Sequence, residues 1–253
     1  MKPQVKSYNP YHNLGYWFLL FIVLVFAGFY HTYFSVLFEP KLPVVHLHFA
    51  LMSLWVAMLI TQPFLIKYKK RGLHRTIGKM SYVVVPLVLL SAVVMMRVGY
   101  FASIDRLAQE SVNGIQKYTA SEINHLAARG MALPVFYVLW MALFYALAIV
   151  NRKDSGVHAR YMLATALTLL GPTVDRAIFF ILKMETLAFN IPIETFAFLM
   201  IDLVLITLLL QDRSQKRKAV TLMICLGIYV MSQALYFMVM DTRWWENFIT
   251  ELM

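Results

Sequence analysis

Residues 131–150 read MALPVFYVLWMALFYALAIV, a run of twenty residues without one charged side chain. A single helix needs about 20 consecutive apolar residues to cross the hydrocarbon core of a bilayer. Comparable runs cover residues 15–38, 46–66, 77–100, 160–183, 190–210 and 219–240. The runs lack the alternation typical of membrane barrel strands. The sequence therefore predicts an all-α, polytopic membrane protein with about seven transmembrane helices, in which residues 1–253 form one integral membrane domain.

The composition of the whole chain agrees with this prediction. Hydrophobic residues make up 60% of the sequence and charged residues 14%, and the mean hydropathy is +0.66. Water-soluble domains are closer to half apolar and a quarter charged. The single cysteine, Cys225, excludes an intrachain disulfide and a cysteine-rich metal site.

The charged residues are distributed unevenly between the two sides that seven spans create. A net charge of +10 would suit a nucleic-acid-binding protein, but fifteen of the 23 Lys and Arg residues fall on one side. They lie in the N-terminal tail and around the turns after the second, fourth and sixth runs: Lys2, Lys6, Lys67, Lys69, Lys70, Arg71, Arg75, Lys79, Arg152, Lys153, Arg160, Arg213, Lys216, Arg217 and Lys218. That side carries only two acidic residues, Asp154 and Asp212, and most of the others fall opposite.

This charge asymmetry predicts the orientation and the partners of the protein. The positive-inside rule assigns the side rich in Lys and Arg to the cytoplasm. We therefore expect a multi-pass protein of the inner (plasma) membrane, with its N-terminus in the cytoplasm and its C-terminus outside. Short basic turns most often meet anionic lipid headgroups. The predicted partners are the lipid bilayer and such headgroups on the cytoplasmic side, and no nucleic acid.

A sequence repeat relates the second and third runs to the fourth and fifth. Residues 54–58 (LWVAM) precede residues 72–75 (GLHR), and residues 139–143 (LWMAL) precede residues 156–160 (GVHAR). In each copy one helix leads to a basic turn, and a glycine and a histidine open the next helix. A duplicated two-helix hairpin keeps the same orientation in both copies, and parallel repeats of this kind recur in membrane folds. We therefore predict a duplicated hairpin core made of helices 2–3 and 4–5.

His74 and His158 occupy equivalent positions in the two copies. The pseudo-symmetry of the bundle would place them opposite each other, and two neutral imidazoles facing across a bundle form the ligand set of a b-type haem. Two other interpretations stay open. Each histidine can simply mark the interfacial start of a helix beside Arg75 or Arg160. Alternatively, these four residues form an anion or lipid site at two helix N-termini, where the dipole favours negative charge.

Three further histidines fall on the outer side, where His46 and His48 open the second helix and His125 precedes the fourth. Residues two positions apart on a helix point about 200° from one another, so only one of the first two can face a shared site. His48 shares a stripe with Gln62, a polar residue at membrane depth, which favours His48. His125 would supply a second ligand, either for haem or, with His46 and His48, for a metal ion. The alternative is three separate surface histidines.

Polar side chains inside the hydrocarbon are candidate functional residues. Burying one there costs several kcal/mol unless it is paired, so each needs an explanation. An ion pair of Asp175 with Arg97 or Arg176 would be structural. Asp202 is the better functional candidate, because no cation within its own span can neutralise it. The predicted set of intramembrane polar residues is Gln62, Asp175, Arg176 and Asp202.

Several of these residues also form a pattern that resembles known sequences. They are His48-x3-Met52-x2-Trp55, Gln62-Pro63, Leu73-His74-Arg75-x2-Gly78, His158-x-Arg160-x-Met162 and Pro172-x3-Arg176. The pattern is similar to that of the DUF2306-like family of uncharacterised bacterial membrane proteins and covers helices 2–5. It also resembles cytochrome b561 proteins, in which helices 2 and 4 hold one haem and helices 3 and 5 the other. That resemblance implies two ligand pairs, His48 with His125 and His74 with His158.

Three classes of function are compatible with the sequence. The first is a b-type haem protein that moves electrons across the membrane, with a quinol or a respiratory complex as partner. The second is a non-catalytic accessory subunit that binds a lipid or an anion. The third is a metal-dependent membrane hydrolase built from the outer histidines, although no HExxH motif or Ser-His-Asp spacing is present. Whether the protein is an enzyme stays open at this point.

Overall fold

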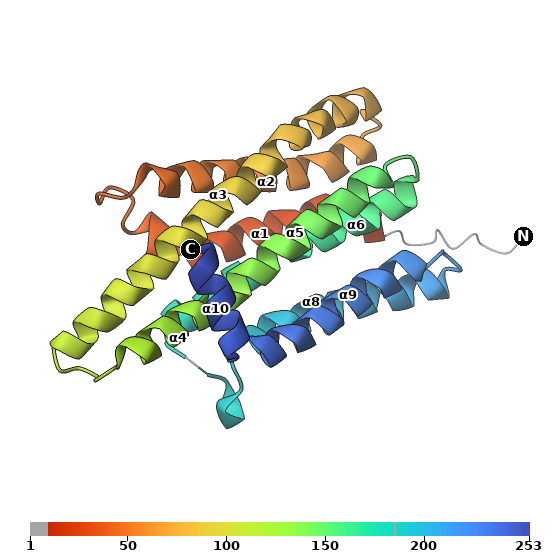
Figure 1. The fold of residues 1–253 in the computed structure, drawn as a ribbon. Coiled ribbons are helices and arrows are strands. Elements are labelled where there is room, and N and C mark those ends of the chain that lie inside the picture. Colours follow the sequence, from red (N-terminus) through yellow and green to blue (C-terminus); the bar gives the residue numbers. More distant parts are fainter. Residues whose placement is uncertain (1–9, 185) are drawn as a thin grey trace, which may run out of the picture.

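The computed structural model describes residues 10–184 and 186–253, and every long element within them is a helix (Figure 1). Seven of these helical segments are long and apolar enough to cross a membrane. The prediction of an all-α polytopic membrane protein is therefore confirmed. Lys2 and Lys6, counted above among the basic residues of one side, lie outside the described residues.

The spans follow one another as predicted, with two additions. The first is α1 (Leu14–Phe29), continued by a π-helical turn (Tyr30–Phe34), and the next two are α2 (Pro43–Lys67) and α3 (Arg71–Val112). The fourth combines α4 (Ala120–Gly130) with α5 (Ala132–Val150), and the fifth combines α6 (Ser155–Leu167) with α7 (Leu170–Ile181). The last two are α8 (Glu194–Ser214) and α9 (Val220–Val239). The additions are the extension of α3 beyond residues 77–100 and the C-terminal helix α10 (Arg243–Leu252).

Side-chain caps determine where two of these helices start. At the start of α4, the Glu122 N–H donates to the Thr119 hydroxyl oxygen, and the Thr119 N–H donates to Glu122 Oε2 at 2.7 Å. At the start of α6, Asp154 Oδ1 accepts two backbone N–H groups of the first turn. Such caps satisfy the donors that every helix N-terminus leaves unpaired. They fix the beginnings of the helices that carry His125 and His158.

The fifth span is broken between α6 and α7. Pro172 has no N–H and cannot donate to the carbonyl of Thr168, so one helical hydrogen bond is missing here. Threonine hydroxyls on both sides of the break donate to other backbone carbonyls. Thr168 donates to a carbonyl of the preceding turn at 2.8 Å, and Thr173 donates to Leu169 O at 2.9 Å. Lipid cannot form hydrogen bonds with backbone groups, so a break inside a span is tolerated only where hydrogen bonds within the protein surround it.

The broken fifth span lies at the centre of the bundle. In its most apolar window 67% of the residues are buried, against 11% to 28% for the other spans. It contacts α1, α5, α8 and α9. The predicted hairpins α2–α3 and α5–α6 are both formed, but the larger buried cluster joins α5 through α9. A smaller cluster around Trp55 and Val85 connects α2–α3 to the rest, so the core is displaced from helices 2–5 toward the later spans.

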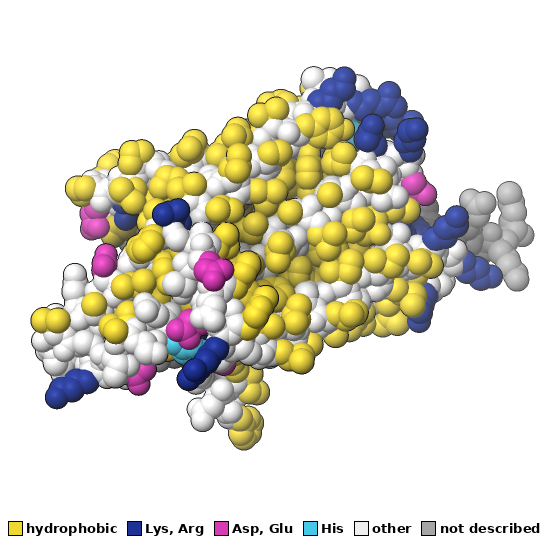
Figure 2. Space-filling model, in the orientation of Figure 1, with side chains coloured by type: hydrophobic (Ala, Val, Ile, Leu, Met, Phe, Trp, Pro, Cys, Tyr) yellow, Lys and Arg dark blue, Asp and Glu magenta, His cyan; other side chains and the backbone are white. Residues whose placement is uncertain are grey.

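The two ends of the bundle differ in charge (Figure 2). We call the basic end the one formed by the turns at residues 68–70, 151–154 and 215–219. We call the acidic end the one formed by residues 35–42, 113–119 and 186–193 together with α10. Lys and Arg side chains gather at the basic end, Asp and Glu gather at the acidic end, and hydrophobic side chains cover the surface between them.

Candidate functional site

The basic end holds the two histidines of the repeat. The Nδ1 atom of His158 lies 2.8 Å from the carbonyl oxygen of Ala148. A carbonyl can only accept, so Nδ1 carries the hydrogen and Nε2 keeps its lone pair when the ring is neutral. His158 and His74 interact electrostatically. Both histidines of the repeat thus lie at the basic end, one at the start of α6 and the other at the start of α3.

Gln62 of α2 lies beside this pair. Its Nε2 atom donates to the backbone carbonyl of His74 at 3.3 Å. Its Oε1 atom is buried without a hydrogen-bond partner in the described part of the chain, and so is His74 Nδ1. Buried polar atoms are rarely left unpaired, because each costs about 1–3 kcal/mol. A ligand or a water molecule that supplies partners here would remove that cost.

Further polar groups extend this region along the interface between the two hairpins. The Ser81 hydroxyl donates to Gly78 O at 2.6 Å, so the Tyr145 hydroxyl, 2.8 Å away, is the donor to Ser81 Oγ. The Trp55 ring packs edge-on against Tyr145, and its Nε1 atom is buried without a partner among the described residues. We call Trp55, Gln62, His74, Tyr145 and His158 the basic-end cluster. It combines imidazole, amide, phenol and indole groups from α2, α3, α5 and α6.

Arg160, two residues after His158, has a different role from the one predicted. Its Nε and Nη2 atoms donate to Asp212 Oδ2 at 2.9 and 2.6 Å, and both side chains are buried. Tyr11 donates to the same oxygen at 2.8 Å, and Arg217 lies 3.8 Å from Asp212 Oδ1. Burial and the hydrogen bond to Asp212 raise the pKa of the Tyr11 phenol. Because Asp212 neutralises Arg160, the predicted anion site is left with Arg75 as its exposed cation.

At the acidic end, the first two histidines face different neighbours. His46 Nδ1 lies 3.0 Å from the Tyr33 hydroxyl, in the π-helical turn that follows α1. His48 Nδ1 lies 2.9 Å from Ser91 Oγ of α3. Since the Ser91 hydroxyl donates to a backbone carbonyl of its own helix, His48 Nδ1 is the donor in this contact. The two rings diverge, as their spacing on the helix predicts.

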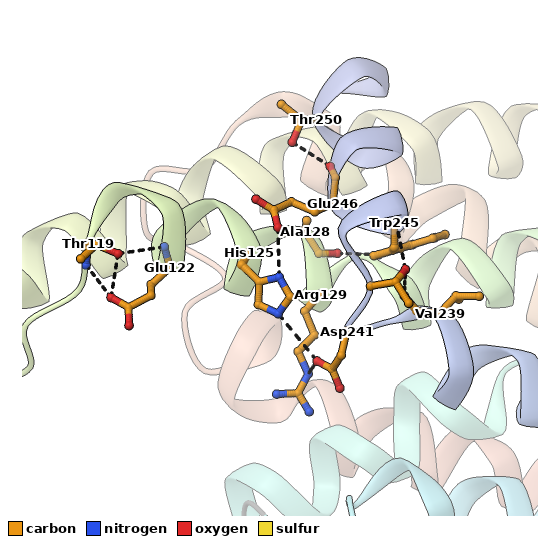
Figure 3. A network of polar contacts seen from close by, with 11 residues as sticks. Thr119, Glu122, His125, Ala128, Arg129, Val239, Asp241, Trp245, Glu246 and Thr250 are labelled. Atoms are coloured by element: carbon orange, nitrogen blue, oxygen red, sulfur yellow. Dashed lines mark hydrogen bonds and ion pairs between the residues drawn. The ribbon is translucent and has the colours of Figure 1, made fainter.

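His125 contacts the C-terminal helix (Figure 3). Its Nδ1 atom lies 3.1 Å from Glu246 Oε2, and its Nε2 atom faces Asp241 Oδ1 at 3.9 Å. Arg129 donates to the same Asp241 oxygen at 2.9 Å, and Trp245 Nε1 donates to the backbone carbonyl of Ala128 at 2.9 Å. Together these contacts tie α10 and the segment before it to α4. A groove of about 480 Å³ lies alongside them, lined by residues of the 113–119 loop, α4 and α10.

These positions bear on two of the predictions for the acidic end. His48 is bonded to Ser91 of α3, whereas His125 faces carboxylates of α10 and of the segment before it, and the haem ligand pair of His48 with His125 stays a prediction. Within residues 10–184 and 186–253, no group of three or more His, Cys, Asp and Glu side chains could hold a metal ion. The predicted metal site of His46, His48 and His125 is therefore not formed.

The intramembrane carboxylates are bonded to neutral partners. Asp175 Oδ2 accepts a hydrogen bond from the Tyr137 hydroxyl at 2.9 Å, and Asp202 Oδ1 accepts one from Gln233 Nε2 at 3.2 Å. Within the described residues, Asp175 forms no salt bridge with Arg97 or Arg176. Arg176 donates to the backbone carbonyl of Pro172 and lies over the Phe29 ring, and Arg97 lies over Phe101.

Sequence reasoning missed the partners Asp212, Tyr11, Tyr137, Glu246 and Gln233. Only Asp212 carried a signal, as one of two acidic residues on a side crowded with cations. The others are ordinary residues in apolar or terminal segments, and only the fold shows what they contact. Comparison of the whole chain with protein-family models, curated proteins and solved structures gave no match.

Proposed function

We propose that this integral membrane protein binds one b-type haem between His74 and His158 and transfers electrons through it. The observation that carries the proposal is the contact of His158 Nδ1 with Ala148 O. Histidines that bind metals usually donate their other ring N–H to a carbonyl or carboxylate, which fixes the ring orientation and the tautomer. His158 has this arrangement before any ligand is considered, and its Nε2 lone pair is the one that would face iron.

The rest of the basic-end cluster fits the same group. His74 supplies a second imidazole from the other hairpin, with a buried nitrogen that has no partner in the described chain. Arg75 is exposed, and no ion-pair partner is found for it among the described residues, so it is available to a haem propionate. When bound, a haem would supply a group that takes up and returns one electron. A quinol or a respiratory complex as the electron partner remains a prediction.

The two alternative functions have weaker support. The anion-binding accessory subunit loses one of its two cations, because Arg160 is neutralised by Asp212. The metal-dependent hydrolase lacks a metal-ligand group in the described residues. A second haem at the acidic end is left out of the proposal, because His48 contacts Ser91 of α3 whereas His125 contacts Glu246 and Asp241 at α10 and the segment before it.

The visible spectrum of the detergent-purified protein from haem-replete cells tests the proposal. We expect a Soret band that shifts and sharpens on reduction with dithionite. His74→Ala and His158→Ala should each remove it or convert it to the spectrum of a weakly held haem. His46→Ala is the matched control and should leave the band unchanged, because His46 contacts Tyr33 at the other end of the bundle. A colourless wild-type preparation would overturn haem binding and favour the accessory subunit.

The orientation is proposed together with the function, with the basic end and the N-terminus in the cytoplasm and the C-terminus outside. In a Cys225→Ala background, Lys70→Cys and Trp244→Cys place one cysteine at each end of the bundle. In intact cells, a membrane-impermeant maleimide should label position 244 and leave position 70 unlabelled until the membrane is permeabilised. Labelling of both positions from the same side would contradict an odd number of spans between them.

A further inference from the structure

Asp175 lies in α7, just after the break in the fifth span, and is only 9% exposed. Tyr137 donates to its Oδ2 atom at 2.9 Å. Its Oδ1 atom is buried and has no hydrogen-bond partner in the described chain. Among the described residues, no Lys, Arg or His nitrogen forms a salt bridge with it, although Arg176 is its neighbour in sequence. The bundle thus buries a carboxyl group that has one neutral hydrogen-bond partner and, among the described residues, no salt bridge.

Such a carboxyl group is tolerated when it can bind a proton. An ionised carboxylate without a cation is costly to bury, whereas the neutral acid avoids most of that cost. The Tyr137 hydroxyl donates to the ionised form and so keeps ionisation within reach. A purely apolar pocket would instead hold the acid permanently protonated. A carboxyl group with one phenol donor and no other hydrogen-bond partner can therefore exist in both the protonated and the ionised state.

Groups on the neighbouring helices decide where the proton can come from. Glu194, the first residue of α8, lies at the acidic end, is partly exposed, and interacts electrostatically with Asp175. Its Oε1 atom accepts a hydrogen bond from the buried Tyr236 hydroxyl of α9 at 2.7 Å. Arg176 also interacts electrostatically with Asp175, although its guanidinium lies over the Phe29 ring of α1 and forms no salt bridge with the carboxyl group. Glu194 is thus a partly exposed titratable group at the acidic end that acts on Asp175.

We propose that Asp175 is a proton-binding site, which takes up a proton from the aqueous phase at the acidic end through Glu194 and returns it there. The new O–H bond forms on Asp175 Oδ1, the oxygen that has no other partner. The proton comes from a hydronium ion, which becomes water, or from the protonated Glu194 carboxyl, which becomes a carboxylate, so charge and atoms balance without any co-reactant. Proton exchange needs no cofactor, and it can be measured whether or not the preparation contains haem.

Infrared difference spectroscopy of the full-length protein across a pH series tests this site. We expect a carboxylic-acid C=O band that grows as the pH falls, shifts in D₂O, and is absent in Asp175→Asn. Asp202→Asn is the matched control, because Asp202 also lies within a span and is bonded to a neutral partner, Gln233 on α9. It should leave the Asp175 band and its midpoint unchanged.

Two neighbouring variants should move the midpoint in opposite directions. Tyr137→Phe removes the donor that stabilises the ionised carboxylate, so the midpoint should rise by about one pH unit, a tenfold change in proton affinity. Glu194→Gln removes a nearby negative charge, so ionisation becomes easier and the midpoint should fall. A band that is present at every pH and insensitive to D₂O would show a permanently neutral acid and overturn the proposal. So would the absence of any band that Asp175→Asn removes.

Discussion

Asp212→Ala is expected to destabilise the folded protein by about 3–5 kcal/mol, the usual cost of removing one partner of a buried ion pair. Asp212 is fully buried, and it accepts hydrogen bonds from both Arg160 and Tyr11. Without it, the guanidinium of Arg160 stays inside the bundle without its ion-pair partner. The change should appear as a large fall in the thermal unfolding midpoint of the detergent-solubilised protein.

A double variant separates charge from packing. Replacing a whole buried ion pair by apolar residues of similar volume is often neutral for stability, because the desolvation cost of both charges disappears. Arg160→Met combined with Asp212→Leu should therefore recover most of the loss. A single Asp212→Ala variant with an unchanged unfolding midpoint would show that the pair adds nothing to the fold.

Gly28→Ala is the second change with a large expected effect, at about 3 kcal/mol of destabilisation. A β-carbon at Gly28 would overlap the backbone carbonyl of Thr173, where α1 crosses the broken span. The obstacle is backbone, so no side chain can rotate away and the two helices would have to separate. Small residues are typical of such close crossings in membranes, where tight packing replaces the hydrophobic effect.

Gly227→Ala provides the matched control for this glycine. Gly227 also lies inside a transmembrane helix, α9, but a β-carbon there would meet no atom within 4 Å. Alanine favours helix over glycine by about 1 kcal/mol, so this variant should unfold at the same temperature as the wild type or higher. Equal destabilisation by the two substitutions would refute close packing as the reason for Gly28.

The sequence was sufficient to predict the spans and the two hairpins, because both depend on local properties. A run such as residues 131–150 is apolar over the whole length of a helix, and the repeat around His74 and His158 is a matter of spacing. The position of the broken fifth span at the centre could not be read in this way. Its hydropathy is the lowest of the seven, yet its burial is the highest, since polar threonines are accommodated inside protein more easily than in lipid.

The sequence could predict those residues of the candidate site that the repeat relates to each other. It could not predict contacts between residues that lie far apart in the chain. His74 and His158 are related by sequence alone, whereas Tyr11 and Asp212 are 201 residues apart and meet only in the folded bundle. The same holds for His125 and Glu246, separated by 121 residues. A transmembrane helix that is apolar on every side does not show which of its faces packs against which neighbouring helix. The contact partners of these residues could therefore be identified only from the structure.

The length of α3 determines how far the molecule extends from the bilayer. Its 42 residues give a rod of about 63 Å at 1.5 Å per residue, and even a tilt of about 40° leaves a height of about 48 Å. The hydrocarbon core is only about 30 Å thick. The preceding helix of the hairpin, α2, starts at the acidic end and has 25 residues, which give a length of about 37 Å, so α3 is much longer than its partner. The surplus of α3, which contacts α4, therefore extends beyond the hydrocarbon core. This end of α3 lies where headgroups and water, rather than acyl chains, surround the protein.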